Sequence, residues 1–163
     1  MADIKDYRIT EKKGYTASLK FYSDSLFTLD IERHIVRELS DYVIHLTFNG
    51  EGWLRITGVD LVVNGGDKIT IDDVSRRVGR QIARQAEDRG SNAFAEEECY
   101  FKLQGNVVQL LKNCTALQIF VKSELVRIVI DVDKSGIRTV KDFFKTHPLI
   151  KEDFDIRKLK WKN

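Results

Sequence analysis

The longest regular pattern in the chain is a four-residue spacing of apolar side chains between residues 70 and 90. Such a spacing places side chains along one side of an α-helix. Thr70 and Asp73 resemble a capping box at its start, and Gly90 suits the left-handed residue that often ends a helix. The pattern therefore predicts a long helix over about residues 72–89. Its apolar side is formed by Val74, Val78, Ile82 and Ala86.

Two shorter helices are predicted from the same periodicity. The first covers about residues 30–40, and the second covers about residues 138–146, ending before Pro148, which cannot continue a helix. The apolar positions of the first are Ile31, Ile35 and Leu39. Those of the second are Val140, Phe143 and Phe144.

Most of the remaining chain alternates apolar and polar residues, as β-strands with one buried face do. The alternation is clear in residues 42–48, 116–122 and 125–132, and turns are expected at residues 49–52 and 64–67. Residues 107–112 fit a strand or a helical turn equally well. The expected fold is therefore α+β: a mostly antiparallel sheet of about six to eight strands packed against the long helix and the two shorter ones. Residues 1–163 are expected to form one domain, with residues 1–14 and 155–163 loosely ordered at its ends.

Composition narrows the class of protein without naming a function. The chain has 163 residues, of which 42% are hydrophobic and 32% charged, which is typical of a globular protein. Its net charge of +2 does not by itself indicate a polyanionic partner. Because the chain has only two cysteines, no export signal and no apolar run of about 18 residues, we expect a cytoplasmic protein that does not enter the membrane.

Arginines gather on the polar side of the predicted long helix, and a second basic segment lies near the end of the chain. Arginine forms forked hydrogen bonds to phosphate, and a tryptophan between lysines can stack on a nucleic-acid base. A solvated helix face with intrahelical ion pairs, or an edge strand protected by lysines, would give the same patterns. The candidate binding residues are Arg76, Arg77, Arg80, Arg84, Lys158, Lys160, Trp161 and Lys162.

Enzymatic motifs are incomplete. Asp131 and Asp133 stand two residues apart at a strand end and would suit a divalent cation, but the same residues also suit an ordinary polar strand exit. His45 and Thr47 form half of a two-histidine phosphoesterase signature, whose chemistry needs a second histidine as acid or base. Neither cysteine has an activating neighbour in the sequence, and residues 64–67 lack the spacing of a phosphate-binding loop.

The sequence therefore favours a small non-enzymatic binding domain, a protein-interaction module of the regulator or inhibitor type that uses an exposed sheet face or edge. The expected partner is another protein. A nucleic-acid-binding protein that uses the arginines and the basic tail is the alternative, and a metal-dependent phosphodiester enzyme is the second alternative. No catalytic residue, metal ligand set or cofactor is assigned, and the oligomeric state is left open.

Overall fold

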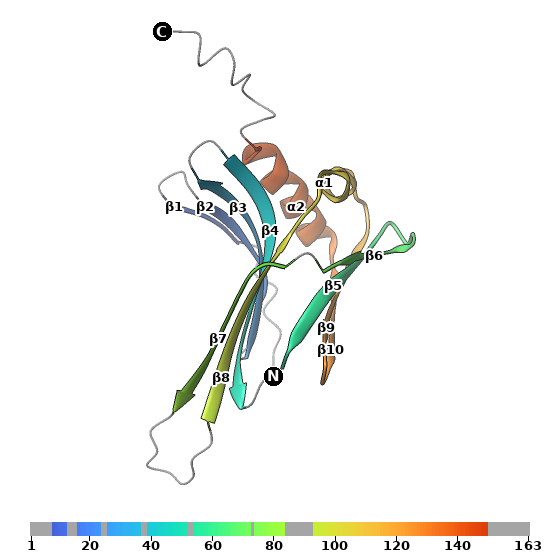
Figure 1. Ribbon diagram of the computed structural model, residues 1–163. Coiled ribbons are helices and arrows are strands. Elements are labelled where there is room, and N and C mark those ends of the chain that lie inside the picture. The colour runs from blue at the N-terminus through green and yellow to red at the C-terminus, as the bar shows by residue number, and fades with distance from the viewer. Residues whose placement is uncertain are drawn as a thin grey trace, which may run out of the picture.

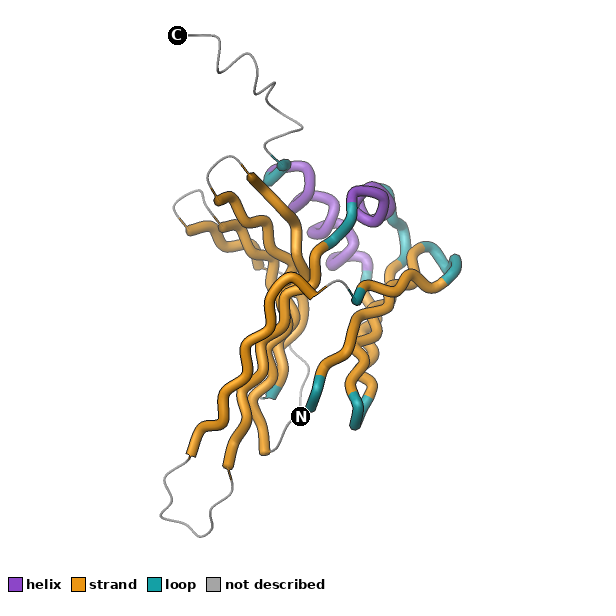
Figure 2. Tube along the Cα trace, viewed as in Figure 1, coloured by secondary structure: helices purple, strands orange, loops and turns teal. Residues whose placement is uncertain are grey.

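The computed structural model describes residues 8–12, 16–23, 26–36, 39–51, 54–72, 74–83 and 93–149. These residues form ten strands and two helices. Figures 1 and 2 show that strands make up most of the molecule, in two sheets that face each other, and that both helices lie at one end. The expected α+β class with mostly antiparallel pairing is confirmed.

The larger sheet has six strands in the order β1-β2-β3-β4-β8-β7, and all neighbours are antiparallel. Its long central strands alternate apolar residues on the inner face with polar residues on the outer face. The strands are β1 (Arg8–Lys12), β2 (Thr16–Ser23), β3 (Phe27–Val36), β4 (Leu39–Glu51), β7 (Val74–Ala83) and β8 (Ala93–Lys102).

The smaller sheet has four antiparallel strands in the order β10-β9-β5-β6. They are β5 (Ile56–Val63), β6 (Lys68–Ile71), β9 (Leu117–Ser123) and β10 (Arg127–Val132). The predicted turn between β5 and β6 is present: Asn64 and Gly65 adopt positive φ angles of 56° and 69°. The side-chain oxygen of Asn64 accepts hydrogen bonds from the backbone of Thr115 and Ala116, which fixes the turn against the start of β9.

The helices α1 (Gly105–Lys112) and α2 (Lys134–Thr146) complete the core. The predicted helix at residues 138–146 is confirmed as the larger part of α2, and Asp133 caps it by accepting a hydrogen bond from the Gly136 N–H at 2.9 Å. Phe143 and Phe144 are buried and pack with their rings against Tyr42 on the inner face of β4. The Tyr42 hydroxyl donates to the His147 carbonyl at 2.6 Å, so α2 is fixed to the larger sheet by apolar and polar contacts together.

One apolar cluster joins both sheets and both helices. Leu29, Ile31 and Leu46 contribute from the larger sheet, and Leu61 and Ile119 from the smaller one. All five are almost completely buried. Since the inner faces are occupied by this core, polar side chains gather on the two outer faces.

The long helix predicted over residues 72–89 is wrong. Residues 74–83 form β7, which pairs with β8, and residues 84–92 lie outside the described part of the chain. A spacing of four residues also matches a strand, because four is a multiple of the strand period of two. A helix would also bury residues three positions after the apolar ones. Three positions after Val74 and Val78 the sequence has Arg77 and Gln81, which are polar.

The helix predicted over residues 30–40 is wrong for the same reason. Residues 27–36 form β3, and β4 begins at Leu39. Residues 107–112, which the sequence left open, belong to α1. The described residues contain ten strands, more than the six to eight predicted, because β3 and β7 add to the count. Within the segments expected to be loosely ordered, residues 8–12 pair as β1, whereas residues 155–163 lie outside the description.

No helix of the described residues combines the length and the apolar character needed to cross a lipid bilayer.

Candidate functional site

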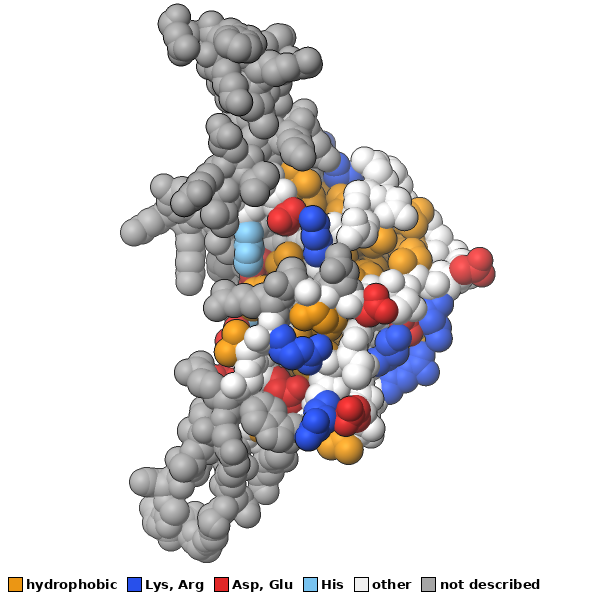
Figure 3. Space-filling model, viewed as in Figure 1, with side chains coloured by type: hydrophobic (Ala, Val, Ile, Leu, Met, Phe, Trp, Pro, Cys, Tyr) orange, Lys and Arg blue, Asp and Glu red, His pale blue; other side chains and the backbone are white. Residues whose placement is uncertain are grey.

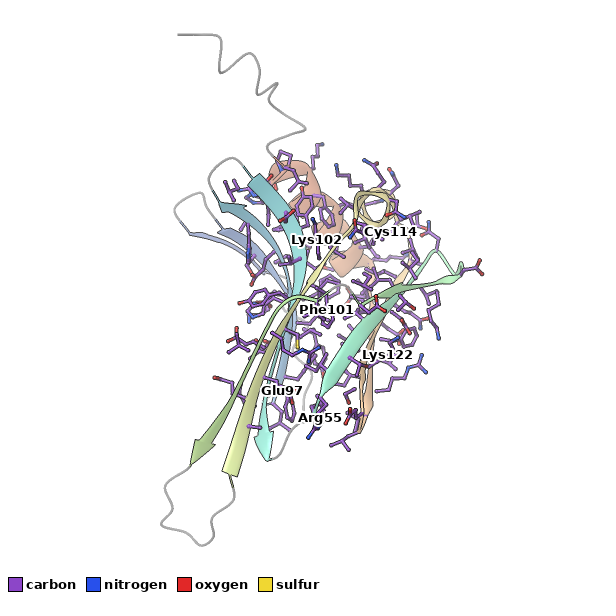
Figure 4. All side chains as sticks on the ribbon, in the orientation of Figure 1. Arg55, Glu97, Phe101, Lys102, Cys114 and Lys122 are labelled. Carbon is purple, nitrogen blue, oxygen red and sulfur yellow. The ribbon has the colours of Figure 1, made fainter. Side chains whose placement is uncertain are left out.

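A buried carboxylate ties the two sheets together at the end away from the helices. Glu97 on β8 is 4% exposed, and its oxygens accept hydrogen bonds from the backbone N–H groups of Leu54, Arg55 and Ile56, where the chain enters β5. Arg55 has a φ angle of 59°, a left-handed conformation that non-glycine residues seldom adopt. Figure 4 shows Glu97 and Arg55 between β8 and β5. The carboxylate therefore stabilises a strained backbone at the crossing from one sheet to the other.

A cleft of about 400 Å³ opens beside this anchor. Arg77 on β7 points across it, and its guanidinium donates to the Ile56 carbonyl at 2.9 Å. Arg55 lies on the opposite wall with its side chain 64% exposed, 3.6 Å from the Glu124 carboxylate. The cleft is thus lined by two guanidinium groups, one from β7 of the larger sheet and one from the residue that precedes β5 of the smaller sheet.

A second groove, of about 620 Å³, runs over the outer face of the smaller sheet. Asp60 lies at its base, with its side chain 3% exposed, and accepts hydrogen bonds from Lys122 Nζ at 3.0 Å and Thr70 Oγ1 at 2.9 Å. Burial would raise the pKa of Asp60, but these hydrogen bonds and the charges of Lys122 and Lys68 outweigh burial and lower it. Asp60 is therefore ionised, and its negative charge at the base of the groove offsets part of the positive charge of Lys122 and Lys68.

The cleft and the groove share Thr57 and Glu124 in their linings, so they form one continuous surface. We call its cations the basic strip: Arg55, Lys68, Arg77, Lys122 and Arg127. Of the three carboxylates that line the same surface, Glu97 and Asp60 are buried and Glu124 is exposed. Figure 3 shows lysine and arginine side chains on this side of the molecule, with acidic side chains interspersed among them.

Apolar side chains border the basic strip at the β9–β10 hairpin. Leu125 is 71% exposed, Val126 50% and Val129 51%. Val129 faces outward beside Phe120, its partner in the β9–β10 register, and the Arg127 guanidinium lies 4.6 Å from the centre of the Phe120 ring. Since β10 is the last strand in the order of the smaller sheet, this mixed apolar and cationic surface lies at a sheet edge.

A different cluster lies on the outer face of the larger sheet. His45 on β4 is bracketed by two carboxylates: its Nδ1 is 2.9 Å from Glu32 Oε2 and its Nε2 is 2.9 Å from Glu98 Oε1. Burial would lower the pKa of His45, but its hydrogen bonds and its attraction to the two glutamates raise it. Burial would raise the pKa of Glu32, but its hydrogen bonds and its attraction to His34 and His45 outweigh burial and lower the pKa to about 2. Among the described residues, one group with the spacing of metal ligands is found, and it consists of Asp30, Glu32 and His45.

The structure separates the binding residues predicted from the sequence. Arg77 joins the cleft through its exposed guanidinium. Of Arg76 and Arg80 the backbone alone is described, within β7, where successive residues alternate between faces, so the predicted arginine face of a helix does not exist. The remaining predicted residues lie outside the described part of the chain: Arg84, Lys158, Lys160, Trp161 and Lys162.

The acidic pair predicted at the end of β10 has two separate structural roles. Asp131 accepts a hydrogen bond from Gln118 Nε2 at 2.6 Å, and Asp133 caps α2. The two cysteines, Cys99 and Cys114, are free and buried, and burial raises the pKa of each thiol, which disfavours the reactive thiolate.

Sequence reasoning missed most of both sites. His45 was singled out, but its partner Glu32 lies on β3, where the helical interpretation hid the alternation of Leu29, Asp30, Ile31 and Glu32. That alternation was the available signal. The neighbours of Arg77 in the cleft gave no such signal, since Arg55 and Glu97 line the cleft from the crossing into β5 and from β8.

Comparison of the chain with protein-family models, with characterised proteins and with solved structures finds no match.

Proposed function

We propose that the protein is a non-enzymatic protein-interaction module whose basic strip and β9–β10 hairpin bind an acidic, partly apolar segment of a partner protein. The observation that carries this proposal is the continuity of five cations over two sheets, directly beside three exposed apolar side chains. Surfaces that combine apolar side chains with arginine are typical of protein partners.

The arrangement of charge supports an anionic partner. Lys122 and Arg127 are directly opposite each other in the β9–β10 register, and like charges at such positions destabilise a sheet. Two of the carboxylates that line the surface are buried, so they offset part of the cationic charge without occupying the exposed surface. An anionic segment bound over the strip would relieve the remaining repulsion between Lys122 and Arg127.

The apolar residues favour a protein over a nucleic acid. Leu125, Val126 and Val129 offer no partner to a phosphate backbone, whereas a peptide that alternates acidic and apolar residues would place its acidic side chains over the strip and its apolar ones on the hairpin. The position of β10 at the sheet edge suits a peptide that binds as an added strand. We also assign the protein to the cytoplasm, and its two free, buried cysteines support that assignment.

The proposal is tested by fluorescence anisotropy at low salt with two probes of equal charge, a peptide that alternates glutamate and valine and a single-stranded oligothymidine. We expect the peptide to bind more tightly than the oligonucleotide. Arg127→Glu should weaken binding of the peptide about tenfold or more. Each ion pair of this kind is worth about 1 kcal/mol or more when it is partly desolvated. Lys145→Glu, at an exposed position of α2 away from the strip, is the matched control and should bind as the wild type does.

Three results would reject the proposal. Tighter binding of the oligonucleotide, with the same loss in Arg127→Glu, would assign the strip to nucleic acid instead. Absence of binding to either probe up to about millimolar concentration, or an equal loss of binding in Arg127→Glu and Lys145→Glu, would show that the strip is an ordinary solvated surface.

A further inference from the structure

A polar cluster on the outer face of the larger sheet has the composition and spacing of a metal site. In the register of β3 with β4, Asp30 stands directly opposite His45, and Glu32 follows two residues later on the same face. One ligand atom from each of the three side chains lies within 4.8 Å of the other two. Two ligands that share one ion with bonds of about 2.0–2.2 Å lie about 3.0–3.6 Å apart, so side-chain rotation would have to bring the three ligand atoms somewhat closer around a bound ion.

We propose that Asp30, Glu32 and His45 form a binding site for a divalent transition-metal ion. The site is independent of the basic strip, since it lies on the outer face of the larger sheet and shares no residue with the strip.

The surroundings of His45 match those of a metal-binding histidine. Such a histidine binds the ion through one ring nitrogen and donates the N–H of the other to a carboxylate, which fixes its tautomer and orientation. Here Nδ1 faces Glu32 and the metal-ligand group, while Nε2 faces Glu98 at 2.9 Å. Tyr100 stacks on the imidazole at 4.1 Å between ring centres and donates its hydroxyl to Glu98 at 3.2 Å. The ring is therefore held in place from both its edge and its face.

The Glu32 carboxylate is also held in place by neighbouring side chains. Glu32 is 8% exposed although it lies on an outer sheet face, and His34 Nε2 contacts its Oε1 at 2.6 Å while Ser18 contacts its Oε2 at 3.4 Å. His34 is thus near enough to add a further nitrogen to the site. Because these neighbours hold Glu32 in one orientation, binding an ion would need little further ordering of this side chain.

Asp30 supplies an observation that is independent of this spacing. Its Oδ1 is buried and has no close hydrogen-bond donor among the described residues, and it forms a long ion pair with Lys20 Nζ at 3.9 Å. A buried carboxylate oxygen without a donor is unfavourable by roughly 1–3 kcal/mol or more. A metal ion between Asp30 and His45 would give this oxygen a partner.

Charge and ligand chemistry select the class of ion. Asp30, Glu32 and Glu98 bring three negative charges, and Lys20 brings one positive charge, so a dication balances the cluster when both histidines are neutral. Imidazole nitrogen combined with carboxylate oxygen suits Zn²⁺, Mn²⁺, Fe²⁺ or Co²⁺, whereas Ca²⁺ and Mg²⁺ prefer sites built from oxygen alone.

The test is isothermal titration of the chelator-treated wild-type protein with Zn²⁺, and separately with Mn²⁺ and Mg²⁺. We expect one ion of Zn²⁺ or Mn²⁺ per chain, weaker binding of Mg²⁺, and a rise in Tm with the bound ion. Asp30→Asn and His45→Gln keep the approximate size and the polarity of the native side chains and should each weaken binding by about 100-fold or more, beyond the loss typical of residues behind the ligands. Asp131→Asn removes a carboxylate from the other sheet and should leave the affinity unchanged.

A second measurement uses the wild-type protein alone, so that it does not depend on whether a variant folds. Zn²⁺ should shift the ¹⁵N resonance of one nitrogen of His45 in imidazole spectra, and the His147 resonances should stay in place. The proposal is overturned by absence of binding up to about millimolar metal, by equal affinity in the wild type and the two ligand variants, or by a shift confined to His147. Any of these results would leave the cluster as a hydrogen-bonded polar patch that joins β3, β4 and β8.

Discussion

Replacing Glu97 by glutamine should loosen the crossing between the two sheets. The carboxylate accepts hydrogen bonds from three consecutive backbone N–H groups, those of Leu54, Arg55 and Ile56, and it does so while 4% exposed. Glutamine has nearly the same shape but offers one oxygen and one NH₂ group, so one side of the amide would present a donor to donors. At least one buried N–H group would then lose its acceptor.

The size of the effect follows from the number and the kind of these bonds. A hydrogen bond to a charged group contributes about 1.5–3 kcal/mol, and a buried donor left without a partner costs about 1–3 kcal/mol. If the amide oxygen keeps one or two of the three bonds, the free energy of unfolding should fall by about 2–4 kcal/mol. Because the bonds also hold Arg55 at its positive φ, relaxation of that residue would return about 1 kcal/mol at most. For a chain of this length the Tm should fall by about 5–15 °C.

The assay is urea unfolding followed by circular dichroism, with thermal unfolding in parallel. Glu124→Gln is the matched control, since its carboxylate is 60% exposed and faces Arg55 at 3.6 Å. Exposed pairs of this kind contribute about 1 kcal/mol or less, so the control should stay close to wild type. A Glu97→Gln protein within about 0.5 kcal/mol of the wild type would refute the view that this carboxylate anchors β5 to the larger sheet.

Three further outcomes follow from the fold. Phe143→Ala should lower the free energy of unfolding by about 3–5 kcal/mol in urea titrations, because the ring is fully buried between α2 and Tyr42, and a loss below about 1 kcal/mol would contradict that packing. Asp133→Ala should cost about 1 kcal/mol in the same assay through loss of the α2 cap, and an unchanged stability would show that the cap is replaceable. Asp60→Asn should be less stable than wild type at pH 7, but the difference should shrink as pH falls below 3.8, because the folded-state pKa of Asp60 is lowered and the stability it supplies is lost as the carboxyl is protonated. A difference that stays constant from pH 7 to pH 2 would contradict the ion pair with Lys122.

Local patterns predicted the elements whose partners lie close in sequence. The helix at residues 138–146 was recognisable because Val140, Phe143 and Phe144 lie three and four residues apart, a combination that a strand cannot place on one face. The turn at Asn64 and Gly65 was recognisable because both residues tolerate positive φ. The overall α+β class followed from these features and from the strand alternation.

The two helices that failed share one cause. In residues 74–82 the apolar residues lie only four apart, and in residues 31–39 Ile31, Ile35 and Leu39 repeat with the same spacing, which is common to a helix side and a strand face. The choice between them depends on a neighbour to pair with, which for β7 is β8 and for β3 is β2 and β4. These partners are the neighbouring strands along the chain, but the pairing is a tertiary contact that the apolar spacing of one segment does not show.

The failure of the arginine helix changes the basis of the binding hypothesis. Four arginines on one helix face would have formed a surface from a single element, whereas Arg77 reaches the cleft from β7 and meets Arg55 from the crossing into β5. Lys122 and Arg127 come from the β9–β10 hairpin, where an apolar alternation concealed their role as opposite like charges. A site assembled from three separate parts of the chain has no sequence spacing to recognise.

The small net charge of the chain is the sum of two separated surfaces, and this explains why composition indicated no partner. Acidic residues on the outer face of the larger sheet surround His45, and basic residues on the outer face of the smaller sheet form most of the strip. Packed sheets lie about 10 Å apart and the side chains of their outer faces point away from each other, so the two surfaces neutralise each other little at physiological ionic strength, where charges are screened over about 8 Å. Each surface therefore acts on its own surroundings: a cation is favoured on one side and an anionic segment on the other. Raising the salt concentration should weaken binding at the exposed strip far more than binding at the partly buried Asp30–Glu32–His45 cluster, because screening acts mainly on charges in contact with solvent.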